Sequence, residues 1–276
     1  MTSDVGLRVA AAQGESLPGD LEANLKTAVG LVEEATAGGA RVVVLPELFL
    51  TGYDPESWSD ATCLTLEDVD GERLRPLAAA ATRTGAVVVV GAAVRRAAGS
   101  PQRTISLLLA GRDGVRVVYD KQHLTDEEKG FFTPGDNGCS IRLDGWELGL
   151  GVCFDGNFPE HAAAAAADGA AAYLCPSAYY TGSEHRRDLY YAARALDNGI
   201  YVVFSGLAGR CGSRDFNGGS AVYDPEGRPL DRAGPEPGAI AYAYLDRAEV
   251  VRVQQMNPIL RDRRDDLGVR RRFELP

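Results

Sequence analysis

The 276-residue sequence contains no long uncharged apolar run and no start typical of an exported protein. A membrane-spanning helix needs about 18 consecutive apolar residues, and no segment reaches that length. The first residues, MTSDVGLRVAAAQ, lack the basic region followed by an apolar region that defines a signal peptide. We therefore expect no membrane partner and a cytoplasmic location.

Positive charge and metal-binding residues are also scarce. The formal net charge is −10, and nucleic acids attract proteins with basic surfaces, so no nucleic-acid partner is expected. The one basic cluster, at residues 261–272, is interrupted by aspartates and is interpreted as a solvated or subunit-contact tail. The three histidines show no HxH or HExxH spacing, so no metal site is predicted.

The cysteines are few and do not form a recognisable pairing pattern. Their number is odd and no CxxC occurs, which favours reduced thiols over a disulfide framework in a chain without an export signal. The five are Cys63, Cys139, Cys153, Cys175 and Cys211.

Strand-like and helix-like segments alternate along the chain. Apolar runs and turn signals predict strands at residues 7–12, 41–45, 86–94, 105–110, 115–119, 148–153, 170–175, 200–205, 220–223 and 239–245. Helical spacing and capping residues predict helices at residues 21–35, 74–84, 159–167 and 188–198. This is an α/β pattern with antiparallel additions, and no linker divides it. We therefore expect a single domain over residues 1–276, with a tail from about residue 257.

Groups with obvious reactivity follow three of the predicted strands. Glu47 comes shortly after the apolar run at 41–45, Lys121 follows the strand at 115–119, and Cys153 ends the run that begins at residue 148. Ligands of open α/β sheets bind at the carboxyl ends of the strands. A carboxylate, an amine and a thiol are therefore expected close to one another.

These three groups could together perform nucleophilic catalysis. A thiol with a pKa near about 8.5 is a weak nucleophile unless a base takes its proton or a cation stabilises the thiolate. Glu47 could be that base, and Lys121 could stabilise first the thiolate and then an oxyanion, with the backbone N–H of Phe154 as a second donor. Each residue also has a structural interpretation: Cys153 as a core residue, Glu47 as a cap, and Lys121 as a surface ion-pair partner.

Four motifs carry a resemblance that covers nearly the whole chain. VVLPELFLTGY surrounds Glu47, YDKQHL surrounds Lys121, EKGFFTPGD follows, and GVCFDGNFPE surrounds Cys153. In these motifs the sequence resembles the carbon–nitrogen hydrolases of the nitrilase superfamily. The resemblance implies a four-layer α-β-β-α sandwich and a Glu–Lys–Cys triad without a cofactor. It also implies a second active-site glutamate at Glu128, or at Glu127 if the loop register slips by one.

The resemblance implies hydrolysis of a linear, non-peptide amide through a cysteine thioester, with release of a carboxylic acid and ammonia or an amine. It also implies a homo-oligomer, a dimer or larger, whose C-terminal tails reach across subunits. An N-carbamoyl hydrolase is the alternative. A nitrilase is less favoured because Cys-Phe-Asp stands where nitrile-cleaving members show Cys-Trp-Glu. A non-catalytic scaffold or regulatory member is the hypothesis from another class, and a nucleotide-binding protein ranks last because no phosphate-binding loop is present.

The residues after the cysteine bear on the substrate. Gly156 and Asn157 occupy positions where carbamoylases and ω-amidase-like members usually carry arginines, so a clamp for a substrate carboxylate is missing there. A neutral or amine-bearing amide is therefore expected. Arg186 and Arg187 could supply a clamp from another loop, or could simply begin a solvated helix.

The remaining predicted site residues come from matches to common family positions. His123 is interpreted as a structural hydrogen-bonding residue close to the catalytic lysine. The predicted substrate pocket consists of Tyr53, Tyr179, His185 and Arg186.

Overall fold

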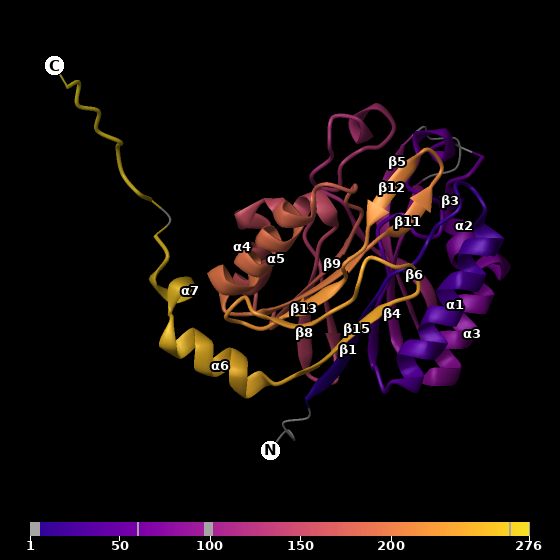
Figure 1. The fold of residues 1–276 in the computed structure, drawn as a ribbon, viewed down its shortest axis with the longest axis horizontal. Coiled ribbons are helices and arrows are strands. Elements are labelled where there is room, and N and C mark those ends of the chain that lie inside the picture. Colours follow the sequence, from indigo (N-terminus) through magenta and orange to yellow (C-terminus); the bar gives the residue numbers. More distant parts are fainter. Residues whose placement is uncertain (1–5, 60, 97–101, 265, 276) are drawn as a thin grey trace.

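The computed structural model describes residues 6–59, 61–96, 102–264 and 266–275, in which two β-sheets pack face to face between two helical layers (Figure 1). Helices α1 (Leu21–Ala37) and α3 (Arg75–Thr84) form one outer layer, and α4 (Pro159–Ala167) and α5 (Glu184–Asn198) form the other. The predicted four-layer α-β-β-α sandwich is confirmed. Residues 1–5 at the start of the predicted domain, and Asp265 and Pro276 of the predicted tail, lie outside the described residues.

The first sheet carries most of the N-terminal half. Within the described residues its strand order is β15-β1-β2-β4-β5-β6, with β3 beside the end of β4. Strands β1, β2 and β4 run parallel, whereas β15, β5 and β6 are added antiparallel. The bounds are β1 Leu7–Ala12, β2 Val42–Val44, β3 Leu64–Thr65, β4 Val87–Arg95, β5 Arg103–Gly111, β6 Gly114–Asp120 and β15 Ile240–Leu245.

The second sheet is built from the C-terminal half. Its order in the described residues is β14-β13-β10-β9-β8-β7, and the parallel strands β8, β9 and β10 form its centre. A separate hairpin, β11 with β12, projects beyond it. The bounds are β7 Ser140–Leu143, β8 Trp146–Leu150, β9 Ala172–Ser177, β10 Tyr201–Gly206, β11 Ala208–Cys211, β12 Arg214–Asn217, β13 Ala221–Tyr223 and β14 Pro229–Arg232.

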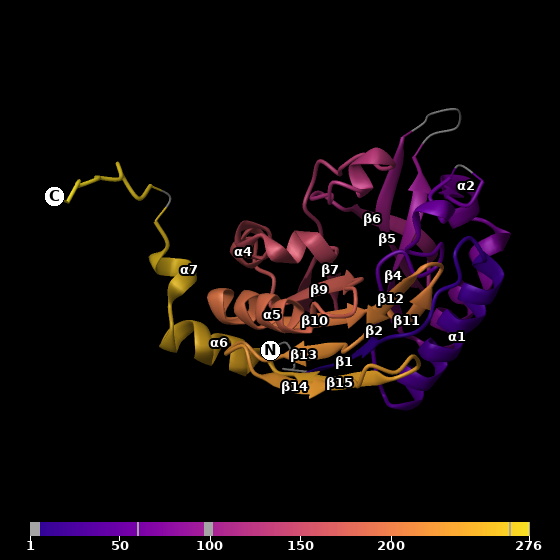
Figure 2. The same cartoon turned by 45° about the horizontal axis from the view of Figure 1, so that its top comes forward.

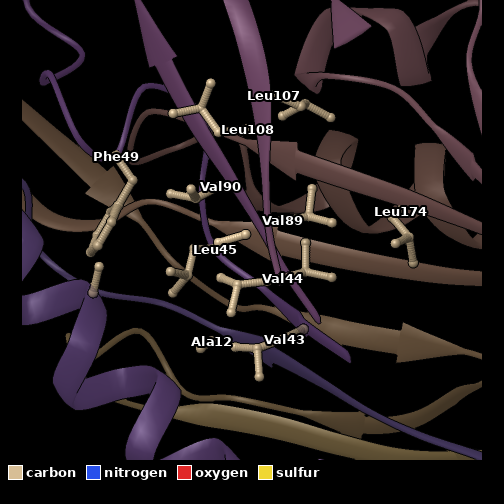
Figure 3. Packing of buried hydrophobic residues seen from close by; sticks show 14 of the residues in the cluster. Ala12, Val43, Val44, Leu45, Phe49, Val89, Val90, Leu107, Leu108 and Leu174 are labelled. Carbon is tan, nitrogen blue, oxygen red and sulfur yellow. The ribbon is translucent and has the colours of Figure 1, made fainter. Parts of the chain in front are cut away.

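The main core lies around the faces of the two sheets. All three residues of β2 are fully buried, as expected for a strand covered on both sides. Figure 3 shows Val44 and Val89 of the first sheet, with Leu174 of β9 from the second. Burial of one such aliphatic side chain is worth about 1.5–3 kcal/mol, so this shared core fixes the two sheets against each other.

Local signals set the ends of α1 and α3 close to where the sequence predicts them, whereas α5 begins at Glu184, before the predicted start at residue 188. The Asp20 side chain accepts a hydrogen bond from Ala23 N at 3.0 Å and caps α1, and the Gly38 N–H closes the other end on Glu34 O. Helix α3 ends at Gly85, whose φ of 72° is the left-handed conformation that glycine adopts without strain.

The strand predicted at residues 148–153 is too long. Strand β8 ends at Leu150, and Cys153 begins a short 3-10 turn, η4 (Cys153–Asn157). The chain leaves the sheet because Val152 N donates to the Asp155 side chain at 3.0 Å instead of to a neighbouring strand. The nucleophile candidate therefore lies on a turn beyond the strand, not on the strand itself.

Several elements were not predicted, because they are short or depend on tertiary packing. They include β7, β14, the β11–β12 hairpin, α6 (Arg247–Met256), α2 (Leu66–Val69), α7 (Ile259–Asp262) and the 3-10 turns η1 (Pro55–Ser57), η2 (Glu72–Leu74) and η3 (Glu128–Gly130). Helix α7 still contacts α4 and α5, and beyond it the chain extends away from the sandwich (Figure 2). No helix in the described part of the chain is long and apolar enough to cross a membrane.

Candidate active site

The four predicted catalytic side chains meet in one buried cluster. Lys121, directly after β6, places its Nζ 2.7 Å from Glu47 Oε1. The same ammonium lies 2.7 and 2.8 Å from the two carboxylate oxygens of Glu128. All three side chains are fully buried, and the Cys153 thiol is close enough to Glu47 for each group to affect the pKa of the other. We call these four residues the catalytic cluster.

A close backbone approach positions Glu47 after β2. Gly91 of β4 donates its N–H to Pro46 O at 3.0 Å, which holds the segment around Glu47 against the strand. A Cβ atom on Gly91 would lie 2.4 Å from Leu48 N and 2.7 Å from Glu47 Cα, distances at which atoms overlap. Glycine at this position therefore allows the glutamate to enter the cluster.

Cys153 has a strained backbone. Its φ of 45° lies in the left-handed region, which costs a non-glycine residue roughly 1–3 kcal/mol. The thiol lies 3.6 Å from Ala178 O, and the residue is 8% exposed. Phe154 follows in the first turn of η4, where backbone N–H groups have no partner within the helix. The turn thus presents a thiol and an N–H donor side by side.

The electrostatics of the catalytic cluster separate its two glutamates. Burial raises the pKa of Glu47 to about 7, with Lys121 acting against the shift and Glu128 adding to it. For Glu128, burial also acts to raise the pKa, but Lys121 and the Tyr53 hydroxyl outweigh it and the pKa lies below its usual range. Glu128 is thus held ionised, whereas Glu47 titrates near neutral pH.

The nucleophile candidate is held as a neutral thiol. Burial and the nearby Glu47 raise the pKa of Cys153 well above its ordinary value, although Lys121 acts to lower it. The pKa of Lys121 is raised despite burial, because Glu47 and Glu128 stabilise the ammonium. Glu47 Oε2 has no hydrogen-bond partner among the described residues. A free carboxylate oxygen is therefore available to accept a proton from the thiol.

The predicted pocket residues divide into two groups. Tyr53 donates to Glu128 Oε1 at 2.6 Å, and the Tyr179 hydroxyl donates to Asn157 Oδ1 at 2.8 Å, so both lie beside the catalytic cluster or its nucleophile turn. His185 and Arg186 are exposed in the first turn of α5. No polar contact joins either of them to the catalytic cluster in the described residues, so their role in substrate binding stays a prediction.

Arg187 is neither a solvated helix start nor a free clamp. It is 5% exposed, and its guanidinium donates to Asn217 Oδ1 and Gly218 O, each at 2.7 Å. It also pairs with Asp188 at 2.8 Å. Asn217 and Gly218 lie at the end of β12, some 30 residues away, so the burial of Arg187 could not be predicted from the sequence around it.

The loop register places Glu128, and not its neighbour Glu127, in the catalytic cluster. Glu127 is turned outward and pairs with Arg214 of β12, which also contacts the hydroxyl of Tyr180. Aromatic rings lie beside this pair: the Tyr53 ring is 6.2 Å from that of Tyr180 and 5.6 Å from that of Phe216. We call these five residues the rim of the site. The sequence indicated neither the hairpin nor its contribution to the rim.

Three residues near the nucleophile turn form a group that could hold a metal ion. The ligand atoms of His123, Asp155 and His161 lie within 4.8 Å of one another. The histidines are 38 positions apart in the chain, so their spacing gave no sign of this group. The carboxylate oxygens of Asp155 already accept hydrogen bonds from protein donors, among them His123 and Tyr119.

Comparison with known proteins agrees with this geometry. The sequence model of the carbon–nitrogen hydrolase family matches residues 8–255. A Pseudomonas protegens protein described as "Hydrolase in pqqF 5'region" is 32% identical over 264 residues, covering 95% of this chain and 90% of that protein. The omega-amidase NIT2 of Mus musculus is 32% identical over 262 residues, covering 88% of this chain and 90% of that protein.

Solved structures of an amidase from Nesterenkonia sp. AN1 have the same fold. A double mutant in complex with acrylamide superposes with a TM-score of 0.81 at 31% identity, covering 94% of each chain. A single mutant with the acetamide moiety of fluoroacetamide covalently added at its active-site cysteine gives a TM-score of 0.81 at 32% identity, covering 95% of each chain. With the family match over most of its length, the chain belongs to the carbon–nitrogen hydrolase family, within the nitrilase superfamily.

Proposed function

We propose that the protein hydrolyses a small, non-peptide amide, with Cys153 as the nucleophile. The observation that carries this proposal is the contact of Lys121 with both Glu47 and Glu128, beside a thiol and an unpartnered Glu47 oxygen. The acetamide adduct at the active-site cysteine of the Nesterenkonia amidase supports a covalent mechanism. The carbamoyl and nitrile alternatives are distinguished from it by the products that the assay below measures.

Glu47 is the proton-transfer group in this proposal. Its free Oε2 accepts the thiol proton as sulfur attacks the amide carbonyl carbon, forming a tetrahedral oxyanion. The same proton then passes to the leaving nitrogen, the carbon–nitrogen bond breaks, and a thioester remains. Water, deprotonated by Glu47, attacks the thioester and releases the carboxylic acid and the thiol. A pKa of about 7 suits a group that must both accept and donate a proton at neutral pH.

Two donors are proposed to stabilise the oxyanion. The Lys121 ammonium supplies charge, and the Phe154 N–H supplies a fixed dipole in the first turn of η4. Glu128 and Tyr53 hold Lys121 in place, since the lysine contacts both oxygens of Glu128 and the tyrosine donates to one of them. Because the thiol is neutral at rest, Lys121 acts on the oxyanion more than on a preformed thiolate.

The substrate is proposed to be small and uncharged. Cys153 is only 8% exposed, and aromatic rings of Tyr53, Tyr180 and Phe216 stand on one side of the catalytic cluster. The charge of Arg214 at this rim is neutralised by Glu127, so it does not offer a free cation for a substrate carboxylate. A large amide would have little access to a thiol that is 8% exposed, and the paired Arg214 offers an anionic amide no free charge at this position.

We also propose that the chain, as one domain over residues 1–276, works as a homodimer or larger assembly in the cytoplasm. Exposed apolar side chains on α5 and α6 support an interface: Leu189, Leu196, Val251 and Met256. The tail from about residue 257 is proposed to join it. The cysteines are all free, which agrees with a reducing compartment. Sedimentation of the purified chain at several concentrations tests the assembly.

The decisive experiment is a release assay on purified wild type and Cys153→Ala. Aliphatic amides, carbamoyl compounds and nitriles are offered separately, and ammonia and carbon dioxide are measured. We expect ammonia without carbon dioxide from small amides, and no turnover in Cys153→Ala. Cys139→Ala, a partly exposed cysteine elsewhere, is the matched control and should keep wild-type rates. Full activity of folded Cys153→Ala would refute the mechanism.

A further inference from the structure

A buried carboxylate outside the catalytic cluster binds both of the segments that carry its reactive groups. Asp155 is fully buried and lies two residues after Cys153. Its Oδ1 accepts from His123 N at 2.8 Å and from His123 Nδ1 at 2.9 Å. Its Oδ2 accepts from the Tyr119 hydroxyl at 2.8 Å and from Val152 N at 3.0 Å. Four donors thus use both oxygens of one side chain.

These donors come from the two segments that carry Lys121 and Cys153. Tyr119 and His123 stand two residues before and two residues after Lys121, so they hold the lysine segment from both sides. Val152 directly precedes Cys153, and Asp155 N in turn donates to Val152 O at 2.9 Å. Reciprocal hydrogen bonds between Val152 and Asp155 therefore span Cys153, whose backbone is left-handed. A strained conformation persists only where surrounding contacts determine it, and Asp155 supplies these contacts.

Contacts of His161 with Tyr119 and Tyr173 fix the direction of the hydrogen bonds. The Tyr119 hydroxyl has one proton and gives it to Asp155, so it accepts from His161 Nε2 at 2.8 Å. His161 Nδ1 then accepts from the Tyr173 hydroxyl at 2.9 Å. Each donor in this series of hydrogen bonds meets an acceptor. The arrangement is therefore rigid, and the Tyr119 hydroxyl has a single orientation.

We propose that Asp155 is a positioning residue, which sets the distance between the Cys153 thiol and the Lys121 ammonium by clamping their two segments together. Tyr119, His123, His161 and Tyr173 complete what we call the clamp. The proposal rests on the proposed function, because it concerns the geometry of the same reaction. Asp155 acts through the other residues and does not touch the substrate.

The same residues could alternatively bind a metal ion, but their contacts favour the clamp. A metal would need the lone pairs of Asp155 and His161 that now accept from Tyr119, His123 and Tyr173. A surface cavity of about 470 Å³ reaches His123 and His161, so an ion could enter. Zinc binding is therefore included as an outcome of the test.

The test compares Asp155→Asn, Asp155→Glu and Tyr119→Phe in the full chain. In Asp155→Asn the amide nitrogen faces donors, so the clamp opens; we expect kcat to fall by about 10²-fold with KM almost unchanged. Asp155→Glu keeps the carboxylate and should recover part of this loss. Tyr119→Phe removes the hydroxyl with its hydrogen bonds to Asp155 and from His161, keeps the ring, and should lower kcat by about 3–10-fold. Glu160→Gln, an exposed carboxylate beside the same cavity, is the control.

Alkylation of Cys153 by iodoacetamide reports the geometry without any substrate. We expect it to slow in the same order as kcat among the variants. Wild-type kcat and alkylation rates in Asp155→Asn and Tyr119→Phe would overturn the clamp. So would stoichiometric zinc binding by chelator-treated protein that is lost in His161→Gln and is needed for activity. Activity persisting in Cys153→Ala would instead refute the proposed function, so the two failures are distinguishable.

Discussion

The catalytic cluster and the clamp are two adjacent groups of buried polar side chains. Each contains a buried carboxylate, and the pKa values of these two carboxylates are shifted in opposite directions. In the catalytic cluster, Glu47 leaves one oxygen without a partner, and burial raises its pKa to about 7. In the clamp, burial also acts to raise the pKa of Asp155, but hydrogen bonds from His123 and Tyr119 and nearby positive charge lower it below its usual range. Full burial is common to both, so the difference comes from the donors that each carboxylate accepts from and from the charges beside it, among them Glu128 beside Glu47.

This difference shows what separates a reactive carboxylate from a positioning one. A buried carboxylate whose lone pairs are all used is stabilised as an anion and resists protonation. A buried carboxylate with an unused oxygen keeps the capacity to accept a proton, at the cost of a desolvated polar atom. Among the described residues, the buried carboxylate oxygen of Glu47 that lacks a donor is the one that the proposed mechanism uses.

Glu47→Gln should give the largest effect, because it removes the group with that capacity. We expect turnover to fall by at least about 10³-fold, since general-base catalysis contributes about 10²–10⁴ and the same residue also protonates the leaving group. Steady-state ammonia release measures the loss. Glu34→Gln, at an exposed position of α1, is the control for loss of charge. A loss under tenfold would mean that another base serves Cys153.

Lys121→Met should follow, because it removes the charged donor shared by the two glutamates. We expect a loss on the order of 10²–10³ in turnover, as for one oxyanion donor. Lys129→Met is the matched control, because Lys129 is exposed and pairs with Asp126 at the surface. If Lys121→Met folds and turns over at a near-normal rate, the lysine has no role at the oxyanion.

The sequence allowed the catalytic cluster to be predicted far better than the clamp. Glu47, Lys121 and Cys153 each come after a strand and inside a specific motif, and Glu128 lies in a fourth motif. The role of Asp155 depends on how the end of β6 packs against η4, which no local pattern reports. For the same reason the inward turn of Arg187, the rim hairpin and the end of β8 at Leu150 appeared only in three dimensions.

The strands and helices themselves were largely predictable, because their signals are local. The apolar runs of β1, β2 and β4 and the caps of α1 and α3 act over a few residues. The edge strands β7 and β14 are short and partly exposed, so they lack the apolar periodicity on which prediction depends. What the sequence conceals is therefore mainly the pairing of distant segments.

Removal of the Glu128 charge should move the pH dependence of catalysis. Glu47 must be ionised to act as the base, so kcat/KM is expected to fall as the pH drops through about 7. Glu128 contributes to the raised pKa of Glu47, and Glu128→Gln should shift this acidic limb to lower pH. Tyr53→Phe removes a donor to Glu128 without changing charge, so its limb should stay near the wild-type position. An unmoved limb in Glu128→Gln would contradict the coupling.

The difference between Glu47 and Asp155 should also appear in thermal unfolding, where we expect the smallest effect. The folded pKa of Glu47 lies above its ordinary value of 4.5, so protonation favours the fold, and wild type loses stability from this group as the pH rises through about 7. Glu47→Gln cannot titrate, and its Tm relative to wild type should therefore increase between pH 5 and pH 8. Asp155 has the opposite shift, and its ionised form stabilises the fold at every pH above its ordinary value of 3.8.

Asp155→Asn should consequently melt below wild type by a nearly constant margin across that pH range. Differences of a few degrees are expected, since about 1 kcal/mol corresponds to roughly 2–4 °C for a chain of this size. Differential scanning calorimetry at matched ionic strength resolves such shifts. If both variants followed wild type in parallel, donor number would not be what distinguishes the two carboxylates. A Tm difference that grows with pH only in Glu47→Gln would tie the raised pKa to the oxygen left without a donor.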